Sequence, residues 1–170
     1  MAGARAKSTA QAKKPAARAK KADVRRSAAR PTRLKASAPK VKRQHKFVAS
    51  RLGAGAFKAD GLRTYAHYRD LGIKHATRGM ALAHVIRFVG QCDPKVVSKM
   101  HTHQCDFQMI YVLKGQITTE IEGQGRHVMN AGDSWLQPQG IPHKVLDYSD
   151  GCEVLEIVLP AESETIELEK

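Results

Sequence analysis

Short apolar segments separated by turn-forming residues recur from residue 80 to residue 159. Within 117–122 apolar and polar residues alternate, which is the period of a half-buried β-strand. Gly90, Lys114-Gly115 and Gly123-Gln124-Gly125 provide turn signals between the segments. Short strands with turns at this spacing are typical of an all-β sandwich or barrel. The predicted strands are 80–89, 96–103, 107–113, 117–122, 126–129, 134–137, 144–147 and 153–159.

The chain before residue 80 lacks this regular pattern. Residues 1–46 have almost no large apolar side chain before Leu34 and are rich in Ala, Lys, Arg, Ser and Pro. Such a segment cannot bury enough surface to offset its ordering entropy, so we expect it to be disordered. Residues 62–73 predict an extended segment that leads into a turn at 74–79. The expected divisions are a disordered tail over 1–46, a linker over 47–60, a barrel domain over 61–162 and an acidic end over 163–170 that frays.

Charge is divided unevenly along the chain. Residues 1–46 hold 16 Lys and Arg against a single acid, Asp23, for a net charge of +15, whereas the rest of the chain has a net charge of −2. A basic block of this kind can bind nucleic acid without sequence specificity, because phosphate contacts carry no base information. A solvated extension and an organellar transit peptide are the alternatives.

The sequence also restricts where the protein works. No apolar run approaches the 18 residues of a membrane span, and no apolar stretch near Met1 predicts a secretory signal. Its three cysteines, Cys92, Cys105 and Cys152, form no CxxC pair and leave one unpaired in any disulfide scheme. These features predict a cytoplasmic protein with no membrane contact and no disulfide framework.

Three histidines and a glutamine carry the candidate chemistry. His101 and His103 are separated by one residue, so on a strand both imidazoles lie on the same face. Two imidazoles on one face provide half of a first-row metal site. Gln108 and His143 can complete the site only if a sheet brings the two segments together.

The spacing of these residues resembles the first motif of the cupin superfamily, which reads His-x-His, three or four residues, Glu, six residues, Gly. His101, His103, Gln108 and Gly115 fit this motif, with Gln in place of the usual Glu. The Gly that usually opens the motif is replaced by Lys95.

The second cupin motif reads Gly, five residues, Pro-x-Gly-x-x-His, three residues, Asn. Gly132, Pro138, Gly140 and His143 fit it, and Asp147 stands at the Asn position. The two motifs together are specific, and the resemblance extends over residues 60–160.

Membership of this superfamily implies an antiparallel double-stranded β-helix, also called an RmlC-like jelly-roll barrel, that holds one metal ion. It also implies a homodimer, but it does not imply one reaction, because cupins include dioxygenases, isomerases, decarboxylases and binders. The Gln is also found in a pectin-degradation cupin that opens unsaturated uronate rings. Imidazole and oxygen ligands suit Fe, Mn, Ni, Zn and Cu alike, so the metal stays open.

Strand alternation nominates two neighbours of the ligands. Lys99 shares the predicted face of His101 and could bind a substrate carboxylate, although a Lys near a strand end often reaches into water. Asp147 shares the predicted face of His143 and could act as a catalytic general base, orient His143, or be a solvated turn residue. The histidines at 45, 67, 75, 84 and 127 have no partner at ligand spacing and are interpreted as structural or exposed.

Two functions from different classes follow. The first is a metal-dependent enzyme of isomerase or dioxygenase type, whose metal polarises a carbonyl or enediolate of an anionic or polyoxygenated small molecule. The alternative is a non-catalytic domain that binds metal and a small ligand, with residues 1–46 contacting nucleic acid. A storage-type barrel that has lost its metal is a third, weaker interpretation, since the ligand set is intact.

Overall fold

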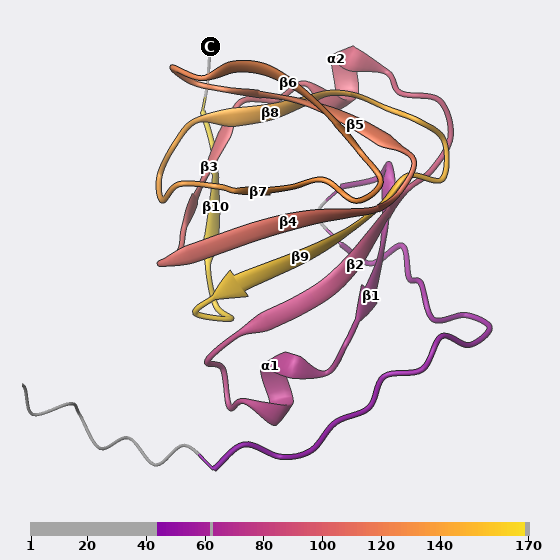
Figure 1. Cartoon of the computed structure of the whole chain (residues 1–170), viewed down its shortest axis with the longest axis vertical. Helices are drawn as coiled ribbons and strands as arrows, with labels where there is room; N and C mark the ends of the chain where they lie inside the picture. The colour runs from indigo at the N-terminus through magenta and orange to yellow at the C-terminus, as the bar shows by residue number, and fades with distance from the viewer. Residues whose placement is uncertain (1–43, 62, 169–170) are drawn as a thin grey trace, which may run out of the picture. The chain divides into compact units, whose positions relative to one another are not determined.

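The computed structural model describes residues 44–61 and 63–168 (Figure 1). The expected disorder of the basic tail, and its suggested contact with nucleic acid, concern residues 1–43 almost entirely and therefore lie outside the described residues. In the part of the chain that is described, no helix is long and apolar enough to cross a membrane.

Two antiparallel sheets of five strands each form the domain, which is therefore the predicted all-β double-stranded β-helix (Figure 1). The first sheet has the order β1 (Ala66–Asp70), β2 (Leu82–Phe88), β9 (Glu153–Leu159), β4 (Phe107–Lys114) and β7 (Ser134–Leu136). The second has the order β10 (Glu164–Glu167), β3 (His101–Gln104), β8 (His143–Tyr148), β5 (Gln116–Ile121) and β6 (Gly125–Asn130). The two segments that carry the cupin-like motifs thus become neighbouring strands, because β3 pairs with β8.

Strand alternation directs one face of each strand into the space between the sheets. In β4, Gln108, Ile110 and Val112 are buried, whereas the intervening side chains are more exposed. One end of this interior is filled by a hydrophobic core that contains Val112 and the rings of Phe88 and Tyr148, which are tilted against each other with centroids 4.8 Å apart. The other end is lined by polar side chains.

The glycine of the first motif has a conformational reason. Gly115 has a φ of 75°, which disfavours other residues, and it ends β4 next to the β8–β9 turn. A Cβ at this position would lie 2.4 Å from Ser149 Oγ and 3.1 Å from Cys152 Cα. Any side chain at residue 115 would therefore push the two turns apart.

The prediction of a strand over 96–103 is wrong in its first half. Pro94–Val97 form the short helix α2, whose N-cap Asp93 accepts a hydrogen bond from the backbone N–H of Lys95 at 3.0 Å. Asp at the N-cap followed by Pro at the first helical position is a helix-start signal that the apolar residues of this segment obscured. The strand begins only at His101.

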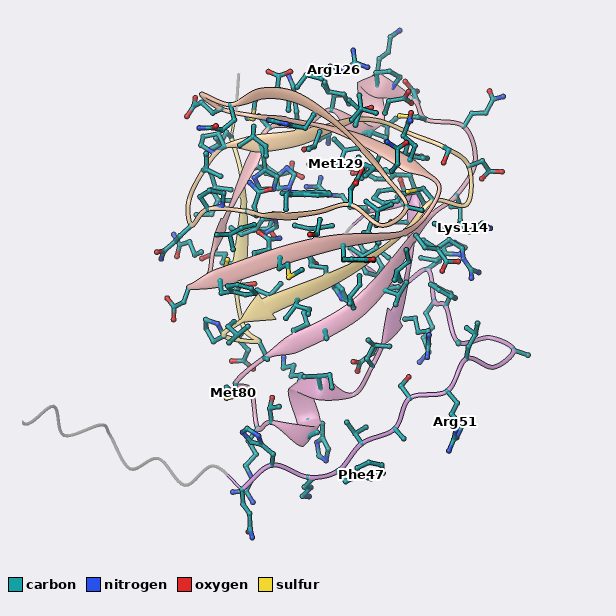
Figure 2. The ribbon with its side chains drawn as sticks, in the orientation of Figure 1. Phe47, Arg51, Met80, Lys114, Arg126 and Met129 are labelled. Atoms are coloured by element: carbon teal, nitrogen blue, oxygen red, sulfur yellow. The ribbon has the colours of Figure 1, made fainter. Side chains whose placement is uncertain are left out.

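The two ends of the domain are more ordered than the sequence predicts. The acidic C-terminal end does not fray over its whole length, because Glu164–Glu167 pair with β3 along the entire strand. Residues 62–73 contain the predicted extended segment as β1, followed by the short helix α1 (Ile73–Ala76) where a turn was expected. In the segment before β1, the guanidinium carbon of Arg87 lies 3.6 Å from the centroid of the Phe57 ring. Phe47, by contrast, projects from the chain and is 94 % exposed (Figure 2).

Candidate metal centre

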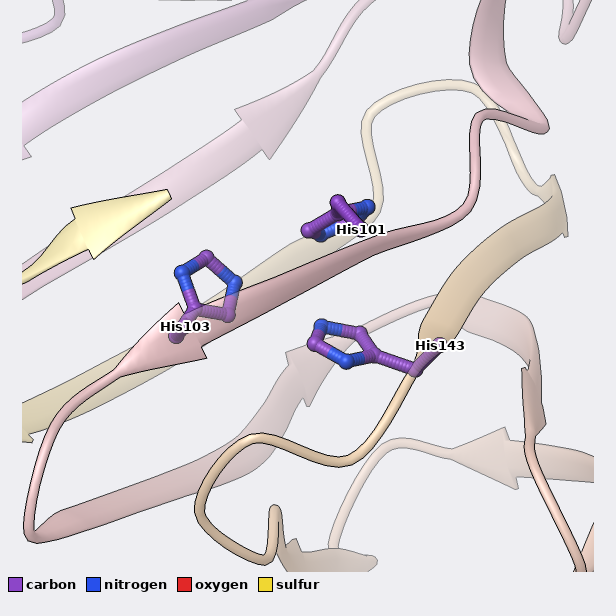
Figure 3. A group of neighbouring side chains, drawn as sticks. All are labelled: His101, His103 and His143. Carbon is purple, nitrogen blue, oxygen red and sulfur yellow. The ribbon is translucent and has the colours of Figure 1, made fainter. Parts of the chain in front are cut away.

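Three imidazoles meet between the sheets. His101 and His103 come from β3, and His143 begins the neighbouring strand β8 (Figure 3). The ring of His101 lies 4.3 Å from that of His143 and 5.1 Å from that of His103, centroid to centroid. One nitrogen from each ring lies within 4.8 Å of the others, a spacing that allows all three to bind a single ion.

Backbone pairing explains this convergence. The one-residue spacing places His101 and His103 on the same face of β3, as predicted. His143 is the direct cross-strand partner of His101, so their side chains project to the same side of the sheet. The loop before His143 is tied to β3, since Gly140 N–H donates to the carbonyl oxygen of His103 at 3.3 Å.

Hydrogen bonds leave one nitrogen of each ring for a ligand. The Nδ1 atoms of His101 and His143 lie 2.8 and 2.9 Å from the carbonyl oxygens of Lys99 and Ile141. A carbonyl only accepts, so both Nδ1 atoms carry the proton and both Nε2 lone pairs remain available. His103 Nδ1 is bonded to the Thr165 hydroxyl at 3.0 Å. Partners of this kind orient metal-binding histidines.

The same histidines are neutral at pH 7. Burial lowers the pKa of His101 to about 4, despite an opposing contribution from its hydrogen bond to the Lys99 carbonyl. Burial likewise lowers the pKa of His103 and of His143. A metal ion at neutral pH therefore does not have to displace protons from these rings.

Gln108 lies on the facing sheet and lines the same cavity, and its carbonyl oxygen is the atom available to a metal. Its Nε2 donates to Glu156 Oε1 at 2.6 Å, and its Oε1 is buried with no hydrogen-bond partner among the described residues. A carboxylate only accepts, so the amide cannot be reversed without losing this bond. An unpaired buried carbonyl oxygen is costly unless something binds it, which fits a cation.

Glu156 is held as a carboxylate by its neighbours. Burial would raise its pKa, but the hydrogen bond and charge of His84, together with the bond from Gln108, lower it below the ordinary value. His84 Nε2 lies 2.5 Å from the second carboxylate oxygen, across the β2–β9 pair. Both side chains are largely buried.

The three histidines and Gln108 line a cavity of about 460 Å³ that is walled by both sheets. A model of the cupin domain matches residues 89–158, and these contain both motifs of the site. Residues 89–158 therefore form a cupin domain. No curated protein sequence matches it.

Solved structures share the fold of this cupin at low sequence identity. It covers 88 % of KdgF from Halomonas sp. with 62 % of its own length, at 18 % identity and a TM-score of 0.50. It covers 87 % of the polyketide cyclase RemF from Streptomyces resistomycificus with 72 % of its length, at 18 % identity and a TM-score of 0.57. It covers 96 % of an RmlC-like cupin from Shewanella frigidimarina NCIMB 400 with 70 % of its length, at 19 % identity and a TM-score of 0.53. At these identities the likeness concerns the fold alone.

The two neighbours nominated by strand alternation do not line the cavity of the cupin. The Lys99 side chain is exposed and lies in the segment after α2, where the strand alternation assumed for it does not apply. Asp147 is exposed as well and bonds to the backbone N–H of Tyr148 at 2.9 Å. The register of β8 on β5 shifts between the pairs Val145–Thr119 and Asp147–Thr118, which leaves Leu146 without a partner. This irregularity reverses the alternation, so that Tyr148 and not Asp147 is buried.

Sequence reasoning missed or misread several charged or titratable side chains of the cavity, among them Glu156, His84 and Arg63. Glu156 sits between the inward-facing Val154 and Val158 of β9, and a charged residue at such a position was the available signal. His84 was interpreted as structural or exposed, yet it lines the cavity and pairs with Glu156. Arg63 lines the rim, largely buried, with Nη1 2.8 Å from Glu167 Oε1. It lies outside both motifs, so nothing in them could identify it.

Proposed function

We propose that this cupin is a metal-dependent enzyme that acts on an anionic or polyoxygenated small molecule in a reaction of isomerase or dioxygenase type. His101, His103, His143 and Gln108 would hold one divalent transition metal ion. The observation that supports this most directly is the buried Oε1 of Gln108, which has no hydrogen-bond partner in the described part of the chain, on a residue that lines the same cavity as the three imidazoles.

The donor set fits a first-row metal. Imidazole nitrogens and an amide oxygen bind Fe, Mn, Ni, Zn and Cu, and all four donors are neutral. When bound, such an ion supplies Lewis acidity that polarises a carbonyl oxygen. The chain itself orients the donors through the carbonyls of Lys99 and Ile141, the Thr165 hydroxyl and the Glu156 carboxylate.

Charge around the cavity favours an anionic ligand. A neutral donor set leaves the full charge of the ion uncompensated, and Arg63, which is paired with Glu167, adds a cationic group to the cavity lining. The Arg63 charge also contributes to lowering the pKa of all three histidines, so its field reaches the donors. Glu156 is a buried carboxylate bonded to His84 and Gln108, while Asp60 is an exposed acid of the cavity lining.

The cavity also has the size and lining of a small-molecule site. Its volume of about 460 Å³ lies within the range of roughly 300–1,000 Å³ that ligand pockets occupy. Ile86, Ile110 and Val154 give its walls apolar surface beside the polar groups.

A non-catalytic binder with a nucleic-acid-contacting tail is the competing proposal, and the net charge of +15 on residues 1–46 favours it. Turnover separates the two. The chain should be loaded with each candidate metal under anaerobic conditions and screened against uronates, diketones and catechol-type compounds, with oxygen uptake recorded. Metal-dependent conversion of any of them supports the enzyme, whereas ligand binding without conversion across the whole screen supports the binder.

A further inference from the structure

A second glutamine faces the cavity beside Gln108. Gln137 follows β7 directly, and its backbone N–H donates to the Gln108 carbonyl oxygen at 2.8 Å. Its side chain is only 3 % exposed and lines the same cavity. Its Nε2 is buried and has no hydrogen-bond partner among the described residues.

The orientation of this amide is fixed by its neighbour. Trp135 Nε1 donates to Gln137 Oε1 at 3.1 Å. An indole N–H only donates, so the atom that faces it must be the oxygen and the free end must be the NH₂ group. The following residue, Pro138, also restricts the backbone of Gln137 to extended conformations.

The two glutamines are thus held in opposite senses. Glu156 accepts a hydrogen bond from the NH₂ group of Gln108, which leaves the Gln108 oxygen available to a ligand. Trp135 donates to the oxygen of Gln137, which leaves the Gln137 NH₂ group available. A free carbonyl oxygen suits a cation. A free amide donor cannot bind a cation and requires an acceptor, which a ligand in the cavity can provide.

We propose that Gln137 recognises the substrate by a hydrogen bond. Its Nε2–H would donate to one oxygen of a small molecule whose other oxygen binds the metal. This inference rests on the proposed function, because it places the ligand at the metal. It favours ligands that carry a second acceptor oxygen in addition to the metal-binding one, such as 2-oxo acids, 2-hydroxy acids and vicinal diketones. Trp135 is the positioning residue that keeps the donor, and not the oxygen, directed at the ligand.

The test uses the full chain loaded with cobalt(II), whose visible absorption reports ligand binding. Pyruvate is the probe with two neighbouring oxygens. Imidazole is the control probe, because it binds metal through one nitrogen and its other nitrogen carries a hydrogen and cannot accept from Gln137.

Replacing the amide should affect only the first probe. Gln137→Met should lower the affinity for pyruvate by roughly two- to tenfold, which is the range of a single lost hydrogen bond. The affinity for imidazole and the cobalt content should stay unchanged. Gln124→Met, an exposed turn position, is the matched control and should alter neither probe. Equal loss of pyruvate and imidazole, or unchanged pyruvate affinity, would overturn the proposal.

A second variant keeps the test decisive if Gln137→Met does not fold. Trp135→Phe keeps the Gln137 amide but no longer fixes its orientation. The affinity for pyruvate should therefore fall by about twofold, while the affinity for imidazole should not change. Unchanged pyruvate affinity in Trp135→Phe would contradict the positioning role. Wild-type protein that takes up no cobalt would refute the metal centre and this inference with it, whereas cobalt-loaded protein indifferent to both substitutions would refute the inference alone.

Discussion

The contact between Glu156 and Gln108 gives the sharpest perturbation of the proposed centre. Glu156→Gln keeps the shape but removes the charge, and it offers Gln108 an amide that can face it either way. Removing a group that orients a metal ligand typically lowers metal affinity by about 10- to 100-fold. We therefore expect the metal dissociation constant of Glu156→Gln to rise by at least about tenfold.

This loss should depend on Gln108. In a double-mutant cycle with Gln108→Ala, residues in direct contact show coupling energies of about 0.5–3 kcal/mol. The 2.6 Å bond between these side chains predicts a coupling near 1 kcal/mol, so that Glu156→Gln costs about fivefold less once Gln108 is absent.

Chelator competition measures the four dissociation constants, and melting temperatures without metal separate folding from binding. Glu153→Gln is the matched control, because Glu153 lies on the same strand but pairs with Arg87 rather than with Gln108. Effects of Glu156→Gln and Gln108→Ala that add to within about 0.5 kcal/mol would refute the idea that the carboxylate acts through the glutamine.

Three further predictions concern the rest of the chain. Removing residues 1–43 should leave the melting temperature and metal content unchanged but abolish salt-sensitive nucleic-acid binding, and retained binding would contradict the tail assignment. Native protein should expose at most one fast-reacting thiol, Cys92, because burial raises the pKa of Cys152 to about 11 and Cys105 is also buried; three fast thiols before denaturation would contradict the packing. Light scattering should give about twice the 18.7 kDa chain mass, because we expect a homodimer. A mass equal to one chain would contradict the homodimer.

The fold was predictable because each local signal agreed with the next. Alternation over 117–122 and the strong turn at Lys114-Gly115 gave strands within two residues of those observed. The convergence of His101, His103 and His143 was predictable as well, since strand parity fixes the first two and the cupin resemblance supplies the third.

The surroundings of the site were less predictable, because they depend on which strands meet. Glu156 meets Gln108 and His84 only through the β4–β9 and β2–β9 pairings, which no local pattern reveals. Asp147 was misplaced because an irregularity at Leu146 reverses the parity of its strand, and a single-residue shift of this kind leaves no clear mark in the sequence. Lys99 was misplaced because the helix signal at Asp93 and Pro94 was overlooked.

Metal content is the most direct test of the central claim. After reconstitution with Fe, Mn, Ni, Zn or Cu and gel filtration, the protein should retain about one ion per chain of at least one of these metals, as measured by inductively coupled plasma mass spectrometry. His101→Ala with His103→Ala should retain none, because only one histidine of the three would remain. His45→Ala with His75→Ala removes two exposed histidines and should bind as the wild type does. Wild-type protein that retains none of the five metals, or a His101→Ala, His103→Ala variant that retains as much as the wild type, would contradict the account.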